Sequence, residues 1–211
     1  MKKAFLIVTI FCLLLVFFVG CEYEHEQNEP RTTENTDMEI INMVDLGCCV
    51  KNIVVRETAL IGANSVTYTG NYFIITLNSD KKVYSPTDII SIWGTLEYIG
   101  ENDSIEIWHG CPFIHFLVEG GIFNFGGGQR DILASSVLQR NRVYHFDFHK
   151  SGGWSADAPD AEFWENFFRE ENLILPAGEY TITIKGAFGL TERVPDNPSG
   201  LMAKLTIIVC F

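Results

Sequence analysis

The sequence predicts an all-β protein, an antiparallel β-sandwich with one short inserted helix. Aromatic residues make up 13% of the chain, and the apolar residues fall in short runs rich in β-branched side chains, a composition typical of sheets. Clusters of Gly, Pro, Asn and Asp separate these runs, as expected of turns. The runs correspond to about seven to nine strands, and that number with short connections favours a two-sheet sandwich.

The most regular strand is predicted at residues 90–98. Its residues 90, 92, 96 and 98 are apolar and fall on one face, whereas residues 91, 93, 95 and 97 fall on the other. Alternation with one apolar face predicts a half-buried strand, and Gly94 within it predicts a bulge. Further strands are expected over residues 50–55, 66–68, 72–77, 105–108, 113–118, 132–138, 143–148, 181–185 and 201–210, with a glycine-rich loop over 120–128.

Residues 160–172 carry the helical pattern. Phe163 and Phe167 lie four residues apart, and each is followed by another aromatic residue. Such spacing gives an aromatic stripe along a short amphipathic helix. Asp157 or Ser155 can cap its first turn. We expect the helix to cover one end of the sandwich, with the stripe packed against the core rather than holding a ligand.

The first 20 residues have the pattern of a secretory signal. Lys2 and Lys3 precede an apolar run over residues 4–20 that ends in small residues, which is the arrangement of a signal peptide. At 17 residues the run is at the lower limit for a bilayer span, so an uncleaved membrane anchor is the alternative. Both interpretations keep the lysines inside and direct the C-terminus outward.

The end of this run, Phe18-Val19-Gly20-Cys21, resembles the lipobox of bacterial lipoproteins, although Phe18 replaces the usual Leu or Val. The resemblance implies cleavage before Cys21, acylation of its thiol with a fatty acid such as palmitate, and anchoring at the extracytoplasmic face of the cell membrane. More than one acyl chain gives stable anchoring. Ordinary secretion stays open. Residues 72–211 also resemble uncharacterised lipoproteins of Gram-positive spore-forming bacteria.

Composition divides the chain into three segments. Residues 1–20 form the signal peptide, residues 21–39 an acidic linker with too few apolar residues to fold, which we expect to be disordered, and residues 40–211 a single domain that is best defined over 72–211.

The formal net charge is −12. It argues against nucleic acid as a partner, because phosphates require clustered Lys and Arg, and against electrostatic attraction to anionic lipid.

Two stretches, residues 84–100 and 175–182, resemble bacterial immunoglobulin-like modules. The second contains a Pro-x-Gly-x-Tyr motif that ends at Tyr180. The intracellular proteinase inhibitor (BsuPI-like) domain shows both features. The resemblance implies an immunoglobulin-like sandwich in which the Tyr180 hydroxyl bonds back to the backbone at a corner. Such modules serve adhesion, ligand binding, protease inhibition or spacing, so the fold does not select a function. The cysteines and the aromatic insertion depart from the inhibitor pattern.

Four cysteines remain in the domain: Cys48, Cys49, Cys111 and Cys210. They allow three pairings, and an exported location permits disulfides. Sequence leaves the pairing open, with buried thiols as the alternative. The CxxC spacing of redox and zinc sites is absent from the chain, which argues against both kinds of site.

The stretch 144–149 alternates aromatic residues with polar ones. On a strand, His145, Asp147 and His149 share the outer face, and two imidazoles with a carboxylate can hold a metal ion. The alternative is a solvated polar face. The HExxH motif of zinc proteases is absent, and no cofactor is predicted. Candidates for completing a metal site are His109, His115 and Asp131.

Three tryptophans, Trp93, Trp108 and Trp154, are candidates for an exposed binding surface that stacks a carbohydrate or anchors a protein partner. Because no catalytic motif occurs, the sequence favours a non-enzymatic, membrane-anchored binding or interaction module outside the cell. One alternative is a metal-binding protein or hydrolase centred on His145, Asp147 and His149. Another is an inhibitor of secreted proteases.

Overall fold

The computed structural model describes residues 54–56, 61–121, 123–128, 130–192 and 200–211. The predicted signal peptide over 1–20 and the predicted linker over 21–39 lie outside these residues. All the described residues belong to one unit, residues 39–211. Within the described part of the chain, no helix is both long and apolar enough to cross a membrane.

One sheet contains five strands in the order β1-β9-β5-β3-β2, with antiparallel pairing throughout. β9 and β5 lie at its centre and β2 forms one edge. Five of the predicted strands therefore occur in this sheet, each within a few residues of its expected place. The bounds are β1 (Val54–Arg56), β9 (Val143–Asp147), β5 (Ile92–Tyr98), β3 (Phe73–Ser79) and β2 (Asn64–Thr69).

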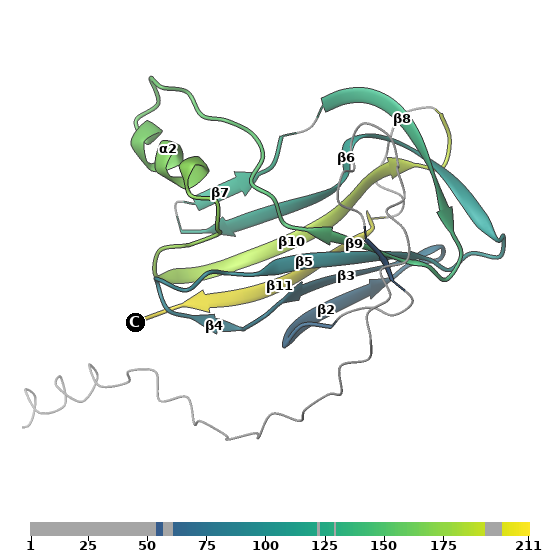
Figure 1. Cartoon of the computed structure of the whole chain (residues 1–211), viewed down its shortest axis with the longest axis horizontal. Helices are drawn as coiled ribbons and strands as arrows, with labels where there is room; N and C mark the ends of the chain where they lie inside the picture. Colours follow the sequence, from purple (N-terminus) through teal and green to yellow (C-terminus); the bar gives the residue numbers. More distant parts are fainter. Residues whose placement is uncertain (1–53, 57–60, 122, 129, 193–199) are drawn as a thin grey trace, which may run out of the picture. The chain divides into compact units, whose positions relative to one another are not determined.

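The second sheet has the order β4-β11-β10-β6-β7, and β8 also pairs with β6. Among the described residues a single helix, α2 (Ala161–Arg169), follows β9 and precedes β10. It lies over β7, outside the two layers (Figure 1). The predicted all-β sandwich with one short inserted helix is thus confirmed. The bounds are β4 (Val83–Tyr84), β11 (Met202–Val209), β10 (Gly178–Gly189), β6 (Ser104–Gly120), β7 (Phe123–Gly126) and β8 (Arg130–Gln139).

One pair of strands departs from the antiparallel prediction. β4 runs parallel to β11, with Val83 opposite Ile208, so the second sheet is mixed. The chain enters β4 soon after leaving β3 in the other sheet. Tyr84, which is buried, secures this crossing because its hydroxyl donates a hydrogen bond of 2.7 Å to the Asp80 carboxylate. A two-residue strand is too short to show periodicity, so the sequence predicted only a turn here.

The long strand β6 joins two segments that the sequence predicts as separate strands. Residues 105–108 and 113–118 belong to one strand of 17 residues. It passes through a cis Cys111–Pro112 peptide bond, and its register against β8 shifts between His109 and Cys111. The first half of β6 pairs with β8, whereas its C-terminal end pairs with β7.

The hydrophobic core lies between the two sheets. Leu96 of β5 and Ile184 of β10 are fully buried there. The predicted bulge at Gly94 is wrong, since β5 stays in register with Leu77 on one side and Phe146 on the other. A Cβ at Gly94 would lie 2.0 Å from Cδ1 of Ile184. The missing side chain therefore makes room for an isoleucine from the opposite sheet.

The start of β10 contains the expected tyrosine corner. The Tyr180 hydroxyl donates a hydrogen bond of 2.9 Å to the Pro176 carbonyl oxygen. The ring itself is buried, at 4% exposure, and packs edge-on against Phe123 with the ring centroids 6.1 Å apart. This contact joins the corner of the sandwich to the aromatic cluster beneath α2.

Candidate functional site: an aromatic pocket beside α2

Helix α2 forms because its aromatic residues share one side. The helix spans Ala161–Arg169 and ends three residues before the predicted end, because Glu170 adopts an extended backbone. Its N-cap is Asp160, which makes no side-chain capping bond. Capping by Asp157 or Ser155 is therefore wrong. The Asp160 carboxylate instead accepts a hydrogen bond of 2.7 Å from Nε1 of Trp164, one turn further on.

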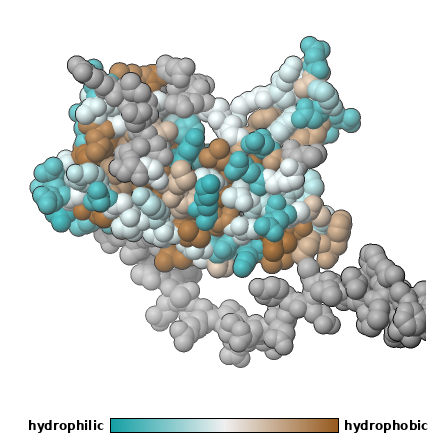
Figure 2. Space-filling view, turned by 180° about the vertical axis from the view of Figure 1, so that it is seen from behind, coloured by the Kyte–Doolittle hydropathy of each residue, from teal (hydrophilic) through white to brown (hydrophobic). Residues whose placement is uncertain are grey.

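The aromatic stripe of α2 packs onto β7, as the sequence predicts. Phe167 is buried, and its ring lies 5.2 Å from that of Phe123 and 5.4 Å from that of Phe125. Trp164 lies 5.4 Å from Phe123. Edge-to-face and tilted contacts of this kind are favourable for aromatic pairs. Figure 2, a view from behind, shows hydrophilic residues over the outer part of the projecting α2 region.

The last ring of the stripe, Phe168, has a different neighbour. The Trp154 indole stacks on it, with the ring centroids 5.6 Å apart and the planes 16° from parallel. Trp154 belongs to the connection between β9 and α2 and is 44% exposed. One face of the indole is thus supported by the helix while much of the ring is open to solvent.

These groups enclose a pocket of about 240 Å³, here called the α2 pocket. It lies where α2, the β9–α2 connection and β7 meet (Figure 1). Its wall combines aromatic rings with hydroxyl, amide and carboxylate groups. The lining residues are Asn124, Phe125, Gly126, Ser151, Gly152, Gly153, Trp154, Ser155, Ala158, Asp160, Trp164 and Phe168.

One hydrogen bond and one glycine conformation shape the wall of the pocket. The Gly128 N–H donates a hydrogen bond of 3.2 Å to the Ser151 carbonyl, which ties the connection to the end of β7. Gly152 has a φ of +125°, a backbone conformation that glycine alone adopts without strain. The run Ser-Gly-Gly-Trp-Ser at 151–155 is typical of a loop, but nothing in it indicates that α2 and β7 complete a pocket.

Lys150 fixes the other end of the helix. Its ammonium group donates hydrogen bonds to the carbonyl oxygens of Phe167 at 2.8 Å, Glu170 at 2.6 Å and Asn172 at 2.5 Å. A cation is favourable at a helix C-terminus, where carbonyl groups lack intrahelical partners. Burial lowers the pKa of Lys150, and the Glu170 carboxylate offsets part of that effect. Lys150 therefore positions α2 against the β9–α2 connection.

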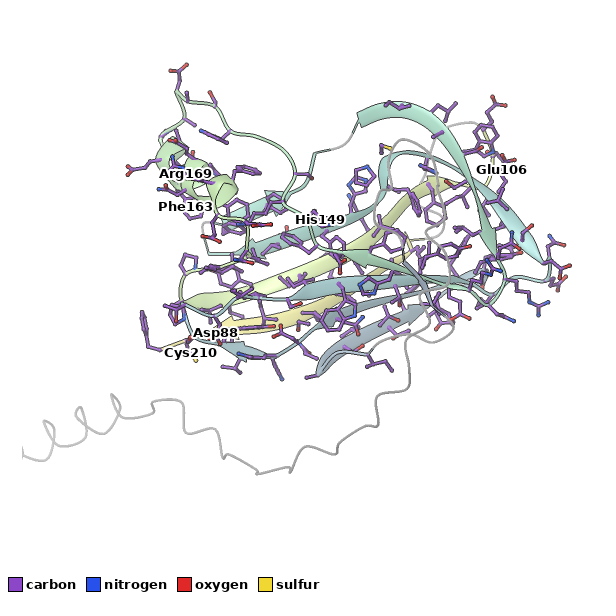
Figure 3. All side chains as sticks on the ribbon, in the orientation of Figure 1. Asp88, Glu106, His149, Phe163, Arg169 and Cys210 are labelled. Atoms are coloured by element: carbon purple, nitrogen blue, oxygen red, sulfur yellow. The ribbon has the colours of Figure 1, made fainter. Side chains whose placement is uncertain are left out.

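The predicted metal residues are only partly brought together. His145 and Asp147 share the face of β9 opposite the buried Tyr144, as predicted, and His145 Nε2 lies 2.9 Å from Asp147 Oδ1. His145 is only 6% exposed, so the alternative of a solvated polar face is wrong at this position. His149 lies beyond β9 and is exposed (Figure 3). Nowhere in the described ranges do three or more His, Cys, Asp or Glu side chains gather as metal ligands.

The histidines expected to complete that site lie on β6, in the other sheet. His109 donates from Nδ1 to the Gly110 carbonyl at 2.6 Å, so Nε2 is the acceptor for the Ser136 hydroxyl at 2.8 Å. Burial lowers the pKa of both His109 and His115, in the second case with help from the charge on Lys185. Burial thus favours the neutral form of His109. The side chain of Asp131 lies outside the described residues.

The three predicted tryptophans lie on three different elements. Trp93 is on β5, opposite Asn78 and Asp147, and Trp108 is on β6, opposite Ser135. Both are half-buried. Trp154 lines the α2 pocket, whereas Trp93 and Trp108 are not among its lining residues. Trp164 and Asp160 also line it; the sequence placed both only within the expected helix of residues 160–172.

The cysteines have separate places. Cys111, next to the cis peptide in β6, is disulfide-bonded. Cys210 follows β11, and its backbone N–H donates to the Tyr84 carbonyl at 2.9 Å. Cys48, Cys49 and the predicted lipidation site Cys21 lie outside the described residues.

Comparisons with protein-family models, with curated proteins and with solved structures give no match.

Proposed function

We propose that the chain is a membrane-anchored lipoprotein that works at the extracytoplasmic face as a non-enzymatic binding module, with the α2 pocket as its ligand site. The α2 pocket is the observation that carries this proposal. It places an exposed tryptophan and several hydrogen-bonding groups in one hollow. Apolar walls with a few polar groups that set orientation are characteristic of small-molecule and cofactor sites.

The position of the pocket supports a binding role. The core between the sheets is built mostly from strand residues, whereas the α2 pocket is built mostly from the connection between β9 and β10. Functional residues are often found on connections that a rigid scaffold positions. A structural helix alone would not require Trp154 to stand 44% exposed on the outer side of Phe168.

The leader supports the location. The Cys21 lipobox and the acidic segment over 21–39 suit a tethered domain, because an acyl chain inserts in the bilayer and like charges extend a linker. We expect the full chain, expressed in a bacterium, to take up labelled palmitate and to sediment with membranes. The Cys21→Ala variant should lose the label. An unlabelled wild-type chain in the cytosol would contradict the location.

Binding is tested with bacterial cell envelopes from which the membrane lipid has been extracted, with the chain kept in detergent, so that the acyl chain at Cys21 contributes nothing to co-sedimentation. We expect the full chain to co-sediment with them and Trp154→Ala to lose most of this binding. Trp108→Phe, a replacement on β6 outside the pocket lining, is the matched control and should bind as the wild type does. Equal binding by all three proteins would rule out the α2 pocket as the ligand site.

A further inference from the structure

We propose that the α2 pocket binds a neutral sugar ring, with the apolar face of the sugar stacked on Trp154 and its hydroxyl groups bonded to the polar rim. This inference rests on the proposed function, since it names the ligand of the same site. Four features of the described residues support it: the stacked indole, the polar rim, the charge of the wall and the size of the pocket.

The stacked indole provides a flat apolar surface. Phe168 supports one face of Trp154 in a near-parallel stack, with the planes 16° apart, and 44% of the residue stays exposed. A pyranose ring presents C–H groups on its faces and hydroxyl groups around its edge. Aromatic rings that are amphipathic and rigid bind such surfaces at low entropic cost, because only two side-chain torsions must be fixed.

The polar rim matches the hydroxyl groups of a sugar. Ser151 and Ser155 offer hydroxyls that donate and accept, and the Asn124 side chain offers an amide that does both. Asp160 Oδ2 already accepts from Trp164 at 2.7 Å, which fixes the carboxylate and leaves Oδ1 to accept from a ligand hydroxyl. Sugar hydroxyls both donate and accept hydrogen bonds, so a rim that offers donors and acceptors can pair with them.

The charge of the wall selects against anions. Among the residues that the structure describes, the lining contains no Lys, Arg or His, and its one carboxylate is that of Asp160. The chain as a whole carries a formal charge of −12. An acidic protein repels an anionic ligand on approach, and a carboxylate in the wall opposes a second negative charge. Phosphorylated or acidic sugars are therefore poor ligands for this pocket.

A cation such as choline is the competing occupant, because aromatic faces attract cations. Cages for quaternary ammonium groups surround the cation with several ring faces. Here Trp154 and Phe168 stack on each other, so their facing surfaces are closed to a ligand. The hydroxyl and amide groups of the rim would also find no hydrogen-bonding partner on the methyl groups of such a cation. The arrangement favours the sugar.

The size of the pocket limits the ligand to about one ring. Its volume of about 240 Å³ lies below the roughly 300–1,000 Å³ of pockets for drug-sized ligands. A single sugar, or one residue of a longer glycan, suits this space. With so few contacts, affinity for a monosaccharide should be in the millimolar range, and a glycan displayed repeatedly on a surface would strengthen it by avidity.

The test titrates the full chain, kept soluble in a polyoxyethylene detergent that contains neither sugar nor choline. The probes are glucose, galactose, N-acetylglucosamine, glucuronate and choline. Tryptophan fluorescence follows binding, and saturation-transfer NMR identifies the ligand protons in contact with the protein. We expect at least one neutral sugar to bind, with saturation transfer strongest to the C–H groups of one ring face, and glucuronate to bind at least tenfold more weakly.

Four variants locate the interaction. Trp154→Ala should abolish sugar binding, whereas Trp154→Phe, which keeps a ring, should retain part of it. Asp160→Asn should weaken binding about tenfold, since an amide presents one acceptor where the carboxylate presented two. Trp108→Phe is the control and should bind unchanged. Far-ultraviolet circular dichroism of each variant excludes loss of the fold.

The outcomes separate this inference from the proposed function. Choline binding that depends on Trp154, without sugar binding, overturns the sugar and keeps the ligand site. Absence of sugar binding at concentrations well above millimolar also overturns the inference, and envelope binding that is lost in Trp154→Ala would still uphold the proposed function. If sugar binding survives Trp154→Ala unchanged, the α2 pocket is neither the sugar site nor the ligand site of the proposed function.

Discussion

The Lys150 ammonium group donates a hydrogen bond to the Phe167 carbonyl and lies 4.3 Å from the centroid of the ring of the same residue. The helix end and the aromatic cluster are thus held by one side chain. Replacing Lys150 by Met keeps the length of the chain but removes the charge and its three hydrogen bonds. We expect a loss of about 1–2 kcal/mol in the free energy of unfolding, measured by urea denaturation.

The same variant separates positioning from stability. Hydrogen exchange in α2 should accelerate in Lys150→Met, because the helix end loses its anchor, and binding at the α2 pocket should weaken. Lys82→Met, a replacement at an exposed lysine, is the matched control and should change neither quantity. Unaltered exchange in α2 would contradict the anchoring role of Lys150.

The tyrosine corner gives a second prediction. Tyr180→Phe removes the hydroxyl that bonds to Pro176 but keeps the buried ring. We expect a loss of about 0.5–1.5 kcal/mol in the free energy of unfolding, measured in urea. Tyr72→Phe, at a ring that is 49% exposed, should change stability much less. A loss at Tyr72 as large as that at Tyr180 would show that the corner bond has no special value.

The contact between Gly94 and Ile184 predicts a coupled pair. Gly94→Ala places a methyl group where Cδ1 of Ile184 lies, and overpacking of this kind costs about 1–3 kcal/mol. Ile184→Val removes that Cδ1 at a cost of about 0.5–1.5 kcal/mol. The double variant should be less destabilised than the sum of the two changes. Additive losses would show that the sheets do not meet closely at this point.

The buried His109 predicts a dependence on acid. Its pKa lies below the usual 6.5 because burial disfavours the imidazolium, and the bond to the Gly110 carbonyl offsets this only in part. Below about pH 6.5 the unfolded chain therefore binds a proton that the folded chain does not, and stability falls as the pH decreases. Urea denaturation at about pH 7.5 and about pH 5 measures this loss.

The variant His109→Gln removes this titrating group. It should unfold more easily at neutral pH, since it disturbs the bonds to Gly110 and Ser136. Its stability should nevertheless fall less than that of the wild type between the two pH values. An equal fall in both proteins would assign the acid sensitivity to other groups, of which His115 is the next to test.

Alternation of side chains was sufficient to predict most of the fold. It located β3, β5, β9, β10 and β11, because each has one face in the core and at least five residues. It failed for β4 and β7, which have two and four residues. It also divided β6 at Pro112, since a proline normally ends a central strand; here the strand continues through a cis peptide bond.

The candidate site was harder to predict, because its residues come from separate segments. Trp154 was predicted as a candidate for an exposed binding surface. Asn124 carried no signal of its own, since β7 was expected to be loop. Asp160 was expected only as the first residue of the helix, and its bond to Trp164 follows only from the geometry of the first turn. A pocket lined by three separate segments leaves no periodic pattern in the sequence that could reveal it.

The connection between β9 and β10 carries the helix and most of the α2 pocket, while the strands carry most of the core. Changes that alter recognition and changes that alter folding therefore fall largely on different stretches of the chain. Such a domain can acquire new specificities by exchange of one connection, in the way that variable loops diversify on a constant framework. It is accordingly a suitable scaffold for engineered recognition.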